Sequence, residues 1–146
     1  MGQPTVEQFD FGITRQWLDE RQIVLIRTAG HMNRPAIDTW ANVLIDTINL
    51  FPATQPIAIC QDLTGPSQGF NAEIRNRLAP IYDHMPKDRP IYSAIALSNS
   101  GVRNMVNVYL RRRKFQPDNL QEQVFDNVET SIHWLRQHLY RDTASV

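Results

Sequence analysis

The stretch PIAICQDLTGPSQGFN, residues 56–71, decides the fold that this sequence predicts. It opens with the apolar run Ile57 to Cys60, and consecutive apolar residues are typical of a central strand that is buried on both faces. The chain then turns polar at Gln61 and continues as a loop that contains two glycines and a proline. Such a loop after a buried strand is where α/β domains commonly carry function. The stretch therefore predicts a small α/β domain with one candidate functional edge.

Strand and helix patterns alternate on both sides of this strand. Before it, residues 11–17 and 22–29 predict an antiparallel hairpin, and the spacing of apolar residues from Ile37 to Phe51 predicts a helix with Trp40 in the core. After it, the expected elements are a helix over 70–81, a strand over 91–97, a helix that is capped by residues 98–101 and ends in residues 111–114, an edge strand over 123–125 and a last helix with residues 128–139 on its apolar face. This order predicts a mixed, mostly parallel sheet of about five strands with about four helices packed on it.

Capping residues and prolines set the expected boundaries of these helices. Asn33 is expected to cap the first helix, and Pro80 to end or kink the second near Ala79. Asp126, with Glu129 three positions later, has the spacing of a capping box for the last helix. Residues 1–8 are expected to be a frayed lead-in.

The composition indicates one domain, residues 1–146, with a core over about 9–140. The 15 basic and 15 acidic residues cancel, so no global field would attract nucleic acid or a membrane. No apolar run is long enough for a membrane span, and the N-terminus lacks a secretory pattern, so we expect a cytoplasmic protein. The single cysteine, Cys60, lies in the apolar run and is interpreted as a packed side chain.

Polar residues at the end of the central strand are the candidate binding residues: Asp62, Thr64, Ser67 and Asn71. They precede a helix start, where backbone N–H groups and the helix dipole can hold an anionic ligand or a phosphoryl group. One hypothesis is that phosphorylation of Thr64 or Ser67 regulates partner binding. The alternative is turn chemistry, because Asp, Thr, Ser and Gly are common in turns for backbone reasons alone.

Three features resemble a known family. They are the hairpin followed by a helix, the strand end Asp62-Leu63-Thr64, and the closing segment over residues 124–135 with its acidic helix start and Trp-Leu pair. Together they are similar to the STAS domain, the fold of anti-sigma-factor antagonists, and more closely to its stand-alone SpoIIAA-like relatives. The resemblance covers roughly residues 9–140 and implies a STAS-like fold. The loop lacks the Asp-Ser pair whose serine is phosphorylated in those antagonists, so the phosphorylation switch is not carried over.

Other constellations give weaker indications of chemistry. The four histidines have no spacing typical of a metal site, and we expect no metal and no cofactor. Gly65 to Gly69 matches the letters of a Gly-x-Ser-x-Gly nucleophile motif, but Asp62 to Gly65 separate Ser67 from the strand, so a hydrolase is the weakest hypothesis. The four basic residues Arg111, Arg112, Arg113 and Lys114 form a candidate contact patch, with compensation of the helix dipole as the alternative.

The leading function predicted from sequence is a non-enzymatic interaction or regulatory module that uses residues 62–71. We expect a protein partner, with a second copy of the chain as one candidate, and neither nucleic acid nor a membrane. The alternative is a protein that binds a small hydrophobic or anionic ligand between helices and sheet. A carrier of this kind is expected to show an apolar pocket of roughly 300 Å³ or more beneath the helix that contains Met105 to Leu110.

Overall fold

A computed structural model describes residues 5–28, 32–64, 72–112 and 117–144. Its sheet has six strands in sequential order: β1 (Val6–Gln8), β2 (Thr14–Leu18), β3 (Ile23–Arg27), β4 (Ile57–Asp62), β5 (Ile91–Ala96) and β6 (Leu120–Phe125). Strands β1, β2 and β3 pair antiparallel, whereas β3 to β6 are parallel neighbours. The predicted α/β class and the mixed, mostly parallel sheet are therefore confirmed.

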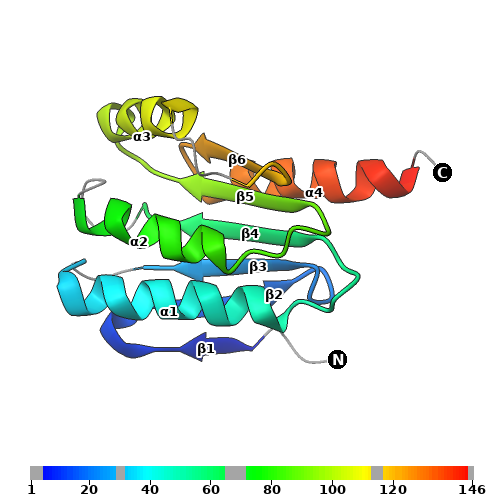
Figure 1. Ribbon diagram of the computed structural model, residues 1–146, viewed down its shortest axis with the longest axis horizontal. Helices are drawn as coiled ribbons and strands as arrows, with labels where there is room; N and C mark the ends of the chain where they lie inside the picture. Colours follow the sequence, from blue (N-terminus) through cyan, green and yellow to red (C-terminus); the bar gives the residue numbers. More distant parts are fainter. Residues whose placement is uncertain (1–4, 29–31, 65–71, 113–116, 145–146) are drawn as a thin grey trace.

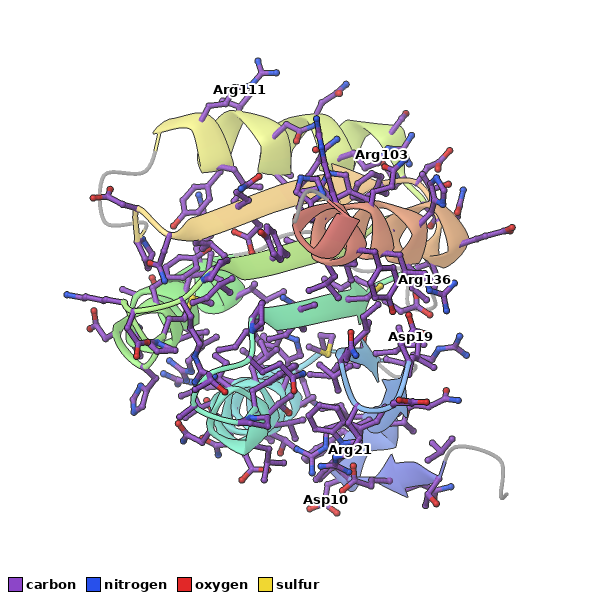
Figure 2. All side chains as sticks on the ribbon, turned by 90° about the vertical axis from the view of Figure 1, so that its right-hand side faces the viewer. Asp10, Asp19, Arg21, Arg103, Arg111 and Arg136 are labelled. Atoms are coloured by element: carbon purple, nitrogen blue, oxygen red, sulfur yellow. The ribbon has the colours of Figure 1, made fainter. Side chains whose placement is uncertain are left out.

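Three helices cover the two faces of the sheet, and the fourth packs at one of its edges. Helices α1 (Arg34–Leu50) and α2 (Ala72–Asp83) lie on one face of the sheet, and α4 (Val128–Ala144) lies on the other (Figures 1 and 2). Helix α3 (Ser100–Arg112) lies beyond β5, at the β6 edge of the sheet, and contacts β6 (Figure 1). None of the helices within the described ranges is both long and apolar enough to cross a membrane.

The two faces of the sheet bury different cores. The larger core lies under α1 and α2 and contains Ile59, Trp40 and Ile81. The smaller core lies under α4, where Ala58, Cys60 and Ala94 meet Leu135. Since successive side chains of a strand point to opposite faces, Ile59 and Cys60 belong to different cores, as the apolar run Ile57 to Cys60 predicts.

The N-terminal prediction is wrong in two places. Residues 6–8 form β1 instead of a frayed lead-in, and Asp10–Gly12 form a short 3-10 turn, so β2 begins at Thr14 and not at residue 11. Phe11 has a φ of 64° in this turn. Bulky residues rarely adopt a left-handed φ, so the sequence gives no indication of a turn at this position. Buried Arg15 holds β1 in place, because its guanidinium donates two 2.8 Å hydrogen bonds to the Glu7 carboxylate and a 2.9 Å bond to Asp46 of α1.

Helix boundaries differ from prediction at two residues. Asn33 caps α1 as expected, since its side chain accepts a 3.0 Å bond from the Ala36 N–H. The cap of α4 is Asn127 and not Asp126, because Asn127 Oδ1 accepts the Thr130 N–H at 2.7 Å. Pro80 does not end α2, which continues to Asp83. It lies in the last turn, and its carbonyl bonds to the His84 ring at 2.8 Å.

The turn between β2 and β3 combines backbone strain with a side-chain anchor. Asp19, Glu20 and Arg21 have φ values of 52°, 57° and 69°, which are left-handed values that side chains with a Cβ rarely adopt. The Asp19 carboxylate accepts two 2.9 Å bonds from Arg136 of α4 and a 2.5 Å bond from the Tyr140 hydroxyl (Figure 2 shows Asp19 and Arg136 together). These bonds tie the strained turn to the far half of α4.

Replacing Glu20 with glycine should stabilise the protein. Glycine adopts a positive φ without the Cβ penalty, and the gain should be about 0.5–1 kcal/mol in the free energy of unfolding. Urea unfolding measures it. The matched control is Glu20→Ala, which removes the same charged group but keeps the Cβ. An equal gain for alanine and glycine would show that the side chain, and not the backbone, is responsible.

Replacing Arg136 with glutamine should reduce the dependence of stability on pH. The hydrogen bonds from Arg136 hold the pKa of Asp19 below its usual 3.8. A carboxyl with a lower pKa when folded adds stability above its unfolded pKa, and that stability is lost as the pH falls through the folded pKa. The variant should therefore be about 1 kcal/mol less stable at pH 7 and should approach the unchanged protein near pH 2.

The measurement for this second prediction is urea unfolding at a series of pH values between 7 and 2. Arg141→Gln is the control, because it removes the same charge from an exposed position on the same helix. A gap between Arg136→Gln and the unchanged protein that stays constant across this range would contradict the assignment of the Asp19 carboxyl.

Candidate functional site

Asp62 and Thr64 lie together in a turn at the end of β4. Asp62 Oδ1 accepts a 3.0 Å bond from the Thr64 N–H and a 2.6 Å bond from the Thr64 hydroxyl, while Oδ2 lies 3.5 Å from Arg27 Nε. This is the local turn chemistry that the sequence offers as the alternative to a binding role. Ser67 and Asn71 lie outside the described residues, so the interaction edge and the phosphorylation hypothesis stay predictions.

The basic patch is described only in part. Arg111 is exposed and extends away from α3 (Figure 2), and α3 ends at Arg112. Arg113 and Lys114 lie outside the described residues. Two apolar side chains of the same helix, Met105 and Val108, are also exposed. The contact role of the patch stays a prediction.

An apolar cavity lies between α2, α3 and the face of the sheet that also carries α1. Its volume is about 50 Å³, and it opens partly to solvent. The cavity is lined by Thr28, Met32, Trp40, Gln61, Leu63, Ile74, Leu78, Tyr82, Ile95, Leu97, Val106, Leu110 and Glu122. It lies toward the carboxyl ends of the parallel strands, where ligands bind in open α/β sheets.

The size of this cavity differs from the sequence expectation. Val106 and Leu110 of α3 line it, as a carrier beneath this helix requires. Its volume is well below the roughly 300 Å³ expected of a carrier pocket. A space of about 50 Å³ exceeds the roughly 10–15 Å³ that one water needs, so the cavity can hold a small group in its present form.

Five of the residues that line the cavity have hydrogen-bonding groups in their side chains, and each makes a hydrogen bond within the protein. The buried Trp40 indole donates a 3.1 Å bond to Gln61 Oε1. The Tyr82 hydroxyl donates a 2.9 Å bond to Glu122 Oε1, and Ser93 from the neighbouring strand donates a 2.8 Å bond to Oε2. Thr28 Oγ1 lies 3.4 Å from the Asp62 carbonyl. These bonds connect α1, α2, β4, β5 and β6 around one space.

Sequence analysis missed most of this cavity. The position of Gln61 can be recognised in the sequence. It follows Ile57 and Ile59 on one face of β4, so a polar residue stands where an apolar one is expected. Glu122 cannot be recognised in this way, since β6 is longer than predicted and its start at Leu120 was not foreseen. Tyr82 was missed because the predicted helix ends near Pro80.

His138 and Cys60 both have structural roles within the fold. The ring of His138 bonds to the Trp134 carbonyl at 2.9 Å, and within the described ranges no three His, Cys, Asp or Glu side chains could hold a metal ion together. Cys60 is buried under α4, and burial, reinforced by the charge of Asp62, raises the pKa of its thiol to about 12. The interpretation of Cys60 as a packed side chain is confirmed.

Comparison of the chain with protein families, curated proteins and solved structures found no match. Inferences about function therefore rest on the geometry of the fold and of the cavity.

Cys60 should resist alkylation in the folded protein. The thiolate is the reacting form, and a pKa near 12 leaves almost none of it at pH 8. We expect iodoacetamide to react at least about a hundredfold more slowly with the native protein than with the protein in urea, followed by intact mass. Glutathione in the same buffers controls for the effect of urea on the reagent. Equal native and unfolded rates would contradict the burial of this thiol.

Proposed function

We propose that this domain binds a small apolar molecule, or the apolar end of a larger one, in the cavity between α2, α3 and the sheet. The observation that carries the proposal is the apolar lining of a partly open space at the carboxyl ends of the parallel strands. This is the ligand-binding alternative of the sequence analysis. The proposal assigns binding and no reaction.

A larger ligand can be admitted through the wall that α3 provides. The wall consists of Val106 and Leu110, which pack on Leu97 and Val124, and this cluster is much smaller than the core under α1 and α2. A segment with few buried apolar contacts opens at lower free energy than the rest of a domain. Displacement of α3 would therefore enlarge the cavity without disturbing the main core.

Filling the cavity should abolish binding of a small apolar probe. Val106 lines the cavity and is 1% exposed, so Val106→Phe places a ring where the ligand would lie. We expect methylenecyclohexane to shift the amide and indole N–H resonances of cavity residues in the unchanged protein, and binding to weaken at least about tenfold in the variant. The indole signal of Trp40, assigned with Trp40→Phe, reports directly on the cavity.

The matched control is Val108→Phe, which makes the same change on the same helix at a residue that is 48% exposed. It should bind the probe as the unchanged protein does. Equal weakening by both variants, or no shift of the Trp40 signal in the unchanged protein, would contradict the proposal.

A further inference from the structure

Gln61 is a buried polar side chain in an otherwise apolar part of the cavity. It is 8% exposed, and on its own face of β4 it follows the buried residues Ile57 and Ile59. Its neighbour in the register is Ile95 of β5, which also lines the cavity. A buried amide in such surroundings is unfavourable unless its donors and acceptor are paired.

The hydrogen bond from Trp40 determines the orientation of the Gln61 side-chain amide, with its oxygen toward the indole. An indole N–H can only donate, so the Gln61 atom 3.1 Å from Trp40 Nε1 must be the oxygen. The amide nitrogen therefore points away from Trp40. It carries two N–H donors, and Gln61 has no partner for them among the residues that the structure describes.

The cavity disfavours an anionic partner for these donors. Glu122 shares the same space, and its carboxylate already accepts bonds from Tyr82 and Ser93. Val124, two residues after Glu122 on the same face of β6, is the register neighbour of Ile95, so Glu122 lies only two strands from Gln61. Repulsion between like charges is strong in a cavity with apolar walls, where the effective dielectric constant is low.

We infer that the ligand presents a neutral hydrogen-bond acceptor, such as the carbonyl oxygen of a ketone, ester or amide, to the side-chain N–H groups of Gln61. The inference rests on the proposed function and deepens it. The apolar walls hold the body of the ligand, the Gln61 amide recognises its carbonyl, and Glu122 excludes carboxylates. This narrows the hydrophobic or anionic ligand of the sequence analysis to a neutral, carbonyl-bearing one.

Two probes of nearly equal shape separate this inference from the proposed function. Cyclohexanone and methylenecyclohexane differ only in C=O against C=CH₂, and their dissociation constants can be measured by titration of the Trp40 indole resonance. We expect cyclohexanone to bind roughly three- to tenfold more tightly, the ratio that one net hydrogen bond supplies. Cyclohexanecarboxylate should bind more weakly than either.

Gln61→Leu should abolish the preference for cyclohexanone and retain binding of methylenecyclohexane. Equal binding of both neutral probes by the unchanged protein would overturn the inference and leave the proposed function standing. Binding of neither would overturn the proposed function. Tighter binding of cyclohexanecarboxylate than of cyclohexanone would overturn the assignment of a neutral ligand.

A measurement on the unchanged protein avoids dependence on the folding of Gln61→Leu. A hydrogen bond from Gln61 should lower the infrared C=O stretching frequency of bound cyclohexanone relative to cyclohexanone in hexane. A bound carbonyl band at the hexane position would overturn the inference even if the ketone binds tightly.

Discussion

Alternation of large and small side chains along β4 and β5 sets the arrangement of the layers. On the α4 face these strands carry the small side chains Ala58, Cys60 and Ala94 beside one large residue, Tyr92. The helix can therefore approach until Ser131 and Leu135 are fully buried. On the opposite face the same strands carry isoleucines, which keep α1 and α2 farther out and leave room for the Trp40 ring. Because side chains on a strand alternate, a register shift of one residue would exchange the side chains of the two cores.

The cavity follows from the way this second face is covered. At its amino end Ile91 and Leu120 join the main core, and at its carboxyl end Val124 packs under α3. Between these two ends, the sheet carries the polar side chains Ser93 and Glu122, which are hydrogen-bonded to each other. A helix packed tightly over these two side chains would exclude the water that could satisfy their remaining hydrogen-bonding groups. Tyr82 reaches across from α2 to satisfy Glu122, and α3 stays at the β6 edge. The space that remains between the two helices is the cavity.

Periodicity in the sequence predicted the helices and the parallel strands, because each has an apolar face that repeats at its own spacing. It did not predict β1, because this strand is held by a bond between Glu7 and the charged Arg15 and has no apolar face of its own. It also did not predict the turn at Phe11, because this residue has a left-handed φ although it is not a glycine. The cavity was also beyond it. Its walls come from residues between Thr28 and Glu122, which only the tertiary structure brings together. Whether the fold belongs with STAS domains stays a prediction, since the α/β class alone is shared by many families.

Alternation of side chains along β4 also separates the polar residues of the predicted functional edge onto the two faces of the sheet. Gln61 and Asp62 are adjacent in sequence, and both mark the point where β4 turns polar, but their side chains point to opposite sides of the sheet. Asp62 accepts the bonds of the Thr64 turn and is thereby committed to the backbone. Gln61 enters the cavity with its oxygen held by Trp40 and its N–H groups available to a ligand. Asp62 therefore stays a predicted candidate, and the ligand inferred above uses Gln61, the polar residue beside it.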